Sequence, residues 1–237
     1  MSQATKKHSL LVAVPTYDGR RCNWRALADL YCVRDIQVRV IEVCSSLLAL
    51  GFNQAWAAAL NSRPNFFLML HEDIIPVQEG WEKLLFRELL DRNASVLSVV
   101  SPIKTPNGLT STAIETDDPW NPRRLSMTEI FEKPETWTEE GLLINTGMML
   151  VNFSEPWVDK VHFTIRDQIV RKNGEWTAEV QPEDWNFSRM AREHGARLYA
   201  TRKVVIQHIG RAGFDNSCAW GTEETDPVHA AKTLVTA

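Results

Sequence analysis

The chain has 237 residues, 44% hydrophobic and 24% charged, which is typical of one globular domain with a full core. Its net charge of −4 and isoelectric point near 5.9 exclude a bulk attraction to nucleic acid or anionic lipid, so a polyanionic partner would need a local basic patch. The sequence has no signal-peptide core, no apolar run near the roughly 20 residues that cross a bilayer, and no paired cysteine spacing, so we expect a soluble cytoplasmic protein without a membrane anchor.

Strands alternate with helices over the first hundred residues. Apolar runs rich in β-branched and aromatic residues predict four buried strands, at residues 9–14, 36–43, 65–70 and 95–100. Apolar residues at helical spacing predict one helix after Ser45 and another after Gly80. This alternation predicts an α/β fold with a mostly parallel sheet covered on both faces.

The second half of the chain differs in composition from the first. Residues 101–140 are rich in proline and predict long, shaped loops, which often form binding surfaces. Further strands are predicted at 142–153, 197–200 and 203–207, and a helix begins after Pro182. The last residues, 210–237, show little periodicity and predict a lid or a loose tail.

The most informative stretch is FFLMLHEDIIP, in which an apolar run ends at His71, Glu72 and Asp73. A buried strand that ends in clustered hard ligands is one way to hold a metal-bound phosphate group at the edge of a sheet. The alternative, that these three residues only end a strand and start a turn, stays open at this point.

Four segments carry a resemblance to a known family. LLVAVPTYDGR, FFLMLHEDIIP, INTGMMLVN and PEDWNFSRMAREHGARLYATRKVVIQHIG occur in the order and approximate spacing of GT-A-fold glycosyltransferases related to family 2, including small soluble phage-type enzymes. The similarity spans roughly residues 9–210. It implies a single GT-A domain over 1–237, with a Rossmann-like, mostly parallel sheet flanked by helices. Residues 1–100 would form the nucleotide-sugar half, 101–210 a loop-rich acceptor and catalytic half, and 211–237 the lid or tail.

The resemblance implies transfer of a hexose from a nucleotide diphosphate sugar, most simply a UDP-sugar, to a hydroxyl acceptor. Asp73 and His208 would hold a divalent cation, Mn²⁺ by preference and Mg²⁺ as a second choice, which offsets the charge of the departing diphosphate. His71 would take the place of the first acid of the family's DxD element, and Glu72 its variable middle position. The donor would also contact Pro15, Thr16, Tyr17, Asp18, Arg20 and Asn53.

The pair Glu183 and Asp184 resembles the family's catalytic acids. Asp184 would act as the base that takes the acceptor proton, with Glu183 hydrogen-bonding a sugar, and the displacement would be inverting. A helix N-terminus stabilises an anion, which fits a base that stays deprotonated. Acids in a first helical turn also stabilise a helix without any catalytic role, so this alternative stays open.

The acceptor is expected to be a saccharide or a hydroxymethylated base in DNA. Nine tryptophans are many for this length, and indole faces stack well on sugars or bases. Trp120 is the expected exposed platform, and the acceptor cleft is expected to include Asn145, Thr146, Gly147 and Trp185. Two other classes remain open, a metal-dependent nucleotide-sugar hydrolase and a noncatalytic carbohydrate-binding module. The sequence gives no indication of the oligomeric state.

Overall fold

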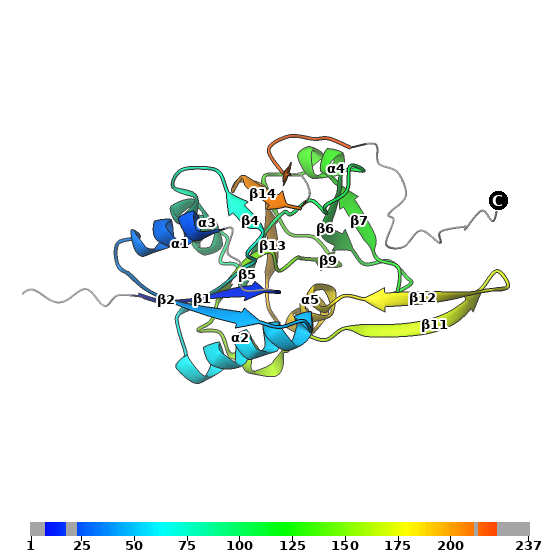
Figure 1. Ribbon diagram of the computed structural model, residues 1–237, viewed down its shortest axis with the longest axis horizontal. Coiled ribbons are helices and arrows are strands. Elements are labelled where there is room, and N and C mark those ends of the chain that lie inside the picture. The colour runs from blue at the N-terminus through cyan, green and yellow to red at the C-terminus, as the bar shows by residue number, and fades with distance from the viewer. Residues whose placement is uncertain (1–7, 18–22, 211–212, 222–237) are drawn as a thin grey trace, which may run out of the picture.

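The computed structural model describes residues 8–17, 23–210 and 213–221 and has a seven-stranded sheet at its centre (Figure 1). The strand order is β2-β1-β3-β10-β5-β13-β8. The strands are β1 (His8–Thr16), β2 (Ile36–Cys44), β3 (Phe66–Leu70), β5 (Val96–Val99), β8 (Thr136–Trp137), β10 (Met148–Asn152) and β13 (Leu198–Thr201). The four strands predicted in the first hundred residues are confirmed as β1, β2, β3 and β5.

The sheet is mixed, because β10 runs antiparallel between β3 and β5. The pairs β1 with β2, β1 with β3 and β5 with β13 are parallel, and β13 with β8 is antiparallel. The strand predicted over 142–153 is interrupted. It divides into β9 (Leu142–Leu143), which belongs to another sheet, and β10, and a turn at residues 144–147 separates the two.

Two apolar layers enclose this sheet, one on each face. On one face, α1 (Trp24–Tyr31) and α3 (Trp81–Asp91) pack Leu30 and Trp81 against alternate residues of β1 such as Leu10. On the other face, α2 (Leu48–Ser62) and α5 (Glu183–Glu193) build a cluster of aromatic side chains. Side chains alternate between the two faces of a strand, so the uninterrupted apolar runs of β1 and β3 supply both layers.

Three smaller sheets and two short helical segments complete the described structure. The prolines of the expected loop region do not prevent regular structure there, since Ser126 and Glu129 form a capping box that starts α4. The remaining elements are β4 (Ile74–Pro76), β14 (Ile206–Ile209) and β15 (Gly213–Asp215) in one sheet, β6 (Leu109–Ile114), β7 (Arg123–Ser126) and β9 in a second, β11 (Arg166–Lys172) and β12 (Glu175–Gln181) in a third, and α4 (Met127–Glu132) with the 3-10 helix η1 (Pro156–Lys160).

The β11–β12 hairpin extends from the body of the protein as an arm (Figure 1). Its turn is made by Asn173 and Gly174, both with positive φ, which is typical of a tight hairpin connection. One face of the arm carries exposed Ile169 and Trp176, at 73% and 72% exposure. The chain passes directly from β12 into α5.

The segment after β14 is anchored as far as the structure describes it. Asn216 is 1% exposed and accepts a hydrogen bond from Ile206 N at 2.8 Å. It also donates to the carbonyl oxygens of Val100 and Val204, each at 3.1 Å. Residues 213–221 are therefore packed against the body, which differs from the loose tail that was one of the two expectations. Residues 222–237 lie outside the described residues.

Candidate functional site

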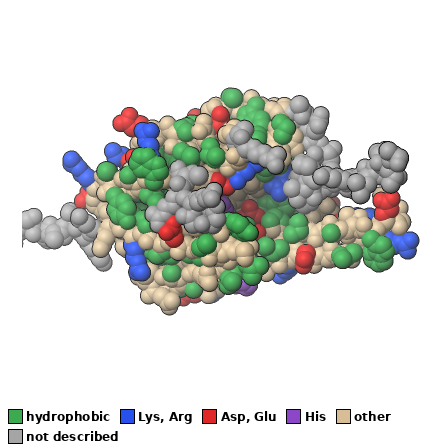
Figure 2. Space-filling model, viewed as in Figure 1, with side chains coloured by type: hydrophobic (Ala, Val, Ile, Leu, Met, Phe, Trp, Pro, Cys, Tyr) green, Lys and Arg blue, Asp and Glu red, His purple; other side chains and the backbone are tan. Residues whose placement is uncertain are grey.

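A cavity of about 320 Å³ opens at the carboxyl ends of β1, β2 and β3, the edge at which open α/β sheets commonly bind ligands. Figure 2 shows that the pictured face is hollowed near its centre and that acidic, basic and histidine side chains gather there. The cavity is lined by Pro15, Thr16, Tyr17, Val43, Ser45, Ser46, Leu48, Gly51, His71, Glu72 and Asp73.

Asp73 and His208 are brought together by two antiparallel strands. In the pairing of β4 with β14, His208 lies opposite Ile74, and Ile209 N donates to the Asp73 carbonyl at 2.8 Å. His208 Nε2 lies 3.5 Å from Asp73 Oδ2, and the ammonium of Lys104 contacts the same oxygen. Burial opposes ionisation of Asp73, but the hydrogen bonds from His208 and Lys104 outweigh it and lower the pKa of this carboxyl far below its usual range.

The other ring nitrogen of His208 is fixed by the backbone. Nδ1 lies 2.7 Å from the Pro102 carbonyl oxygen, and because that oxygen can only accept, Nδ1 carries the proton. Nε2 is therefore the ring nitrogen that lies on the side of Asp73. A histidine that donates one N–H to a carbonyl and turns its other nitrogen to a cation is a common arrangement of metal ligands.

These residues fit a divalent cation. Asp73 Oδ1 is buried and accepts no hydrogen bond from the described part of the chain, so it has lone pairs to offer. Carboxylate together with imidazole suits Mn²⁺. Among the described residues no group of three or more His, Cys, Asp or Glu side chains is placed to hold a metal ion, so further ligands would come from diphosphate oxygens or water.

His71 is a neutral neighbour of this pair. Burial is the main cause that lowers its pKa to about 4, against the attraction of Asp73. Its Nε2 lies 3.3 Å from Thr146 Oγ1, and its backbone N–H donates to the Gly147 carbonyl at 2.8 Å. A neutral imidazole at this position can donate or accept one hydrogen bond but carries no charge, unlike the acid of a DxD element.

A hydrogen bond joins the end of β1 to the turn that follows β3. The Thr16 hydroxyl donates to the Glu72 carboxylate, and Tyr17 beside it is 73% exposed. Thr16 and Tyr17 both line the cavity at the carboxyl end of β1. Asp18 and Arg20 lie outside the described residues.

Glu183 and Asp184 open α5, as predicted from Pro182. Burial raises the pKa of Glu183, and burial together with the neighbouring Glu183 raises that of Asp184 well above its ordinary value, while Arg124 opposes the shift. The helix N-terminus contributes a hydrogen bond from Trp185 N to Asp184 Oδ1 at 2.8 Å. The helix N-terminus favours the charged form of Asp184, but desolvation and the second carboxyl have the larger effect on its pKa.

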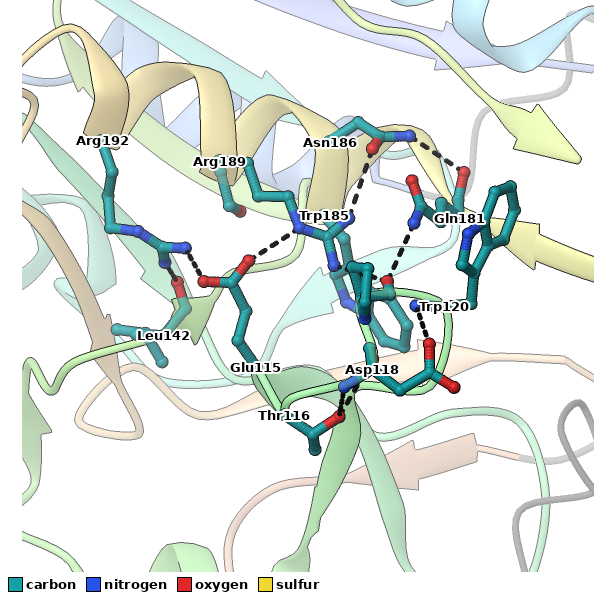
Figure 3. Close-up of polar contacts among 12 residues, drawn as sticks. Glu115, Thr116, Asp118, Trp120, Leu142, Gln181, Trp185, Asn186, Arg189 and Arg192 are labelled. Atoms are coloured by element: carbon teal, nitrogen blue, oxygen red, sulfur yellow. Dashed lines mark hydrogen bonds and ion pairs between the residues drawn. The ribbon is translucent and has the colours of Figure 1, made fainter.

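A network of arginines holds α5 against the loop that follows β6 (Figure 3). Arg189 donates to Glu115 at 2.7 Å and to the Pro119 carbonyl at 2.9 Å, and Arg192 pairs with the same glutamate. Gln181 donates to the same carbonyl of Pro119 at 2.9 Å. These contacts fix the loop 115–120 beside the N-terminal turn of α5, which is the turn that carries Asp184.

Three expected contact residues have structural partners instead. Asn53 binds the backbone of Phe163 with both ends of its amide, at 2.7 and 2.8 Å, which corrects its assignment to the donor. Trp185 is fully buried, donates to Ser111 O at 3.1 Å and lies under Arg124, so its ring has no face for an acceptor. Asn145 is 2% exposed and bonds Val99 O and Gly147 N, so it shapes a turn.

Trp120 is only partly exposed, beside the Arg189 and Gln181 contacts to Pro119, whereas Trp176 on the arm is 72% exposed. The expected platform in the proline-rich loop is therefore less open than the indole of the arm. Thr146 and Gly147 lie next to His71. A Cβ at Gly147 would lie 3.2 Å from Asn145 Oδ1 and 3.3 Å from two atoms of Ile74, so a side chain here would press on both neighbours.

The sequence interpretation missed three features of the site. Lys104 lies in a proline-rich segment and was not assigned to the site from the sequence. Neither was Arg124, which lies over the Trp185 ring and opposes the rise in the pKa of Asp184. The arm was missed although Asn173-Gly174, between runs with alternating polarity, is a strong hairpin signal. Ser45 and Ser46, just after the end of β2, also line the cavity.

No protein-family model and no curated protein matches the chain. Among solved structures, A197 from STIV is similar in fold, with a TM-score of 0.50 and 14% identity over 92% of each chain. HddC from Yersinia pseudotuberculosis, in a complex with GMP-PN, gives a TM-score of 0.34 and 11% identity over 62% of this chain and 77% of its own. The likeness to A197 is one of fold: a mixed α/β architecture with a central sheet and small antiparallel sheets. No helix in the described residues has the length and apolar character to span a membrane.

Proposed function

We propose that this protein is a GT-A-type glycosyltransferase that moves a hexose from a nucleotide diphosphate sugar to a hydroxyl group. The observation that carries the proposal is the pair Asp73 and His208, held by β4 and β14 at the edge of a cavity that opens where β1, β2 and β3 end. The order of the four sequence segments and the mixed α/β fold support it.

The cavity suits the nucleoside and diphosphate of the donor. Tyr17 offers an exposed aromatic face, and Ser46 offers a hydroxyl group just after the end of β2. A UDP-sugar is the donor we propose. A divalent cation, preferably Mn²⁺, would supply a Lewis acid for the departing diphosphate, and Asp73 and His208 would hold it. The neutral His71 would donate a hydrogen bond to an uncharged group of the donor.

Asp184 is the proposed base. The acceptor oxygen forms its bond to the anomeric carbon as the bond to the diphosphate oxygen breaks, and the acceptor proton passes to the Asp184 carboxylate. A carboxyl whose pKa is raised accepts a proton more readily than an ordinary aspartate, which suits this role. Attack from the side opposite the leaving group makes the reaction inverting.

A neutral saccharide is the acceptor that the surface charges favour over DNA. Arg123 pairs with Glu129 and Lys172 pairs with Glu179, so these cations are neutralised within the protein. A protein binds DNA phosphates through lysine and arginine side chains that are available to them. Trp176, on the arm that leads into the helix of Asp184, offers an open indole face on which a sugar ring could stack.

The test is a turnover assay with Mn²⁺, a panel of nucleotide sugars and candidate acceptors, in which release of nucleoside diphosphate is followed with and without acceptor. Release stimulated by a saccharide supports the proposal. Release that does not depend on any acceptor would instead indicate a hydrolase, and donor binding without release would indicate a binding module. Stimulation by hydroxymethylated DNA alone would overturn the choice of a saccharide acceptor.

A further inference from the structure

Lys104 places a positive charge at the proposed cation site. It lies in the loop after β5, and its ammonium contacts Asp73 Oδ2. This is the carboxylate oxygen that faces His208 Nε2 at 3.5 Å. The two atoms that would face a divalent cation therefore already have a cation of the protein itself beside them.

The fold holds Lys104 in this position. The carbonyl of Ile103 accepts a hydrogen bond from Thr105 N at 2.8 Å, and Ile103 N donates to Leu109 O at 2.9 Å, so the backbone on both sides of the lysine is fixed. The aliphatic stem lies over Gly210, where a Cβ would come within 3.0 Å of Lys104 Cδ and 3.4 Å of its Cγ. Gly210 thus leaves room for the stem, and the stem directs the ammonium toward Asp73.

An ammonium ion and a divalent cation compete for one carboxylate group. The ammonium of Lys104 contacts the Asp73 oxygen that faces His208, and a cation held by Asp73 and His208 would lie beside it, where like charges repel strongly away from bulk water. Lysine is also a mobile point charge on a flexible stem, with its side chain 37% exposed, so the ammonium can turn to another anion within reach. A diphosphate bound beside Asp73 would be such an anion.

We propose that Lys104 is a tethered competitor of the divalent cation at Asp73, and that a nucleoside diphosphate relieves the competition by accepting the ammonium. The inference rests on the proposed function. It means that the metal and the diphosphate bind cooperatively: each is weak alone, and each strengthens the other by the same factor. After the exchange Lys104 contacts a phosphate oxygen and adds a second positive charge at the leaving group.

The experiment measures binding of Mn²⁺ to the full chain by electron paramagnetic resonance of the free ion, with and without UDP. For the wild type we expect weak binding of Mn²⁺ alone and a strengthening of roughly tenfold or more with saturating UDP. In Lys104→Met, which keeps the stem and removes the charge, Mn²⁺ alone should bind about tenfold more tightly, and UDP should add much less. Lys104→Arg should restore weak binding, and Lys83→Met, at an exposed position of α3, should behave as the wild type.

Two results would overturn the inference, and they differ in what they leave standing. If Lys104→Met binds Mn²⁺ alone as weakly as the wild type while UDP strengthens binding equally in both, Lys104 does not compete, and the proposed function is untouched. If neither protein binds Mn²⁺ even with UDP, while UDP itself binds by calorimetry, the metal ligands of the proposed function are wrong as well.

Discussion

Asp184 occupies a position where two opposing electrostatic effects meet. The first turn of α5 offers it a backbone hydrogen bond, which favours the charged form, whereas burial and Glu183 favour the neutral form. The result is a raised pKa. Ionisation of Asp184 therefore costs folding free energy at neutral pH, as is common where a group is kept for chemistry.

We predict that Asp184→Asn stabilises the protein at neutral pH while it abolishes transfer. Because the pKa of Asp184 is higher in the folded than in the unfolded chain, the folded state binds more protons between the two values, and stability falls as pH rises through that window. The asparagine does not ionise, so the melting-temperature difference between variant and wild type should grow from pH 4 to pH 8. Transfer should fall by a factor of about 100 or more, and UDP binding should be retained.

Glu193→Gln is the matched control for this variant, since Glu193 is an exposed acid in the last turn of the same helix. Its melting temperature should follow that of the wild type at each pH. A melting-temperature difference for Asp184→Asn that is constant across the range, or that shrinks as pH rises, would show that Asp184 is an ordinary ionised carboxyl.

At the scale of single elements, the β11–β12 arm has two unlike faces. Directly opposite residues of an antiparallel pair share a face, so Ile169 with Ala178 and Arg171 with Trp176 lie together on the exposed one. The opposite face holds Gln168 and Glu179, which form a hydrogen bond at 2.9 Å. The exposed face carries Ile169 and, at its outer end, the indole of Trp176 beside the charged Arg171, and it leads back along the strand toward α5.

We predict that Trp176→Ala weakens the binding of an extended saccharide acceptor and leaves cleavage of the nucleotide sugar in the absence of acceptor unchanged. Loss of one stacked indole should raise KM for the acceptor about fivefold, corresponding to about 1 kcal/mol. Acceptor-independent release of nucleoside diphosphate and the melting temperature should be unchanged, because the side chain is exposed. Trp24→Ala, at 69% exposure on α1, is the control and should have no effect on either reaction. An equal rise in KM for both variants would remove the arm from acceptor binding.

Elements whose pattern is local were predictable from the sequence, and elements whose pairing is non-local were not. The apolar run of β3 and the helical spacing of α2 and α3 depend on neighbours within one segment, so the periodicity predicts them. The antiparallel insertion of β10 between β3 and β5 depends on partners far apart in the chain. The sequence carries no signal of strand direction, and a parallel arrangement was the default expectation.

At the scale of the whole molecule, the residues of the site also come together through contacts that are non-local in sequence, so local patterns did not predict them. The approach of His208 to Asp73 agrees with the resemblance, which supplied this pairing where spacing could not. Neither the residue spacing nor the family resemblance predicted the contact of Lys104 with Asp73. A single lysine in a proline-rich loop carries no sequence signal that tells which side chain it will contact. Asn53 was misassigned for a related reason: its partner, Phe163, is 110 residues away in sequence.

Besides the hydrogen bonds of Asn216, the C-terminal segment approaches the backbone of the middle of the chain closely at Gly108. Gly108 has a φ of +76°, and a Cβ there would overlap the Trp220 carbonyl oxygen and lie 2.8 Å from the Gly221 Cα. The ring of Trp220 stacks on Phe214 at 5.7 Å, and its Nε1 donates to Asp215 O at 2.8 Å, so the carbonyl is not free to move aside. The contact is between two backbones, which cannot give way as a flexible side chain would.

We predict that Gly108→Ala destabilises the protein far more than Gly174→Ala, although both glycines have positive φ. At Gly174, in the turn of the arm, a Cβ meets nothing within 4 Å, so the substitution costs only the left-handed backbone strain of about 1 kcal/mol. At Gly108 the same strain is joined by the overlap with residues 220–221, and the total should reach about 3 kcal/mol or more. Chemical denaturation of the two variants measures the difference. Equal losses would mean that residues 213–221 do not pack against the body as described. The expected result, together with a change in the fluorescence of Trp220, would show that residues 213–221 are part of the folded body.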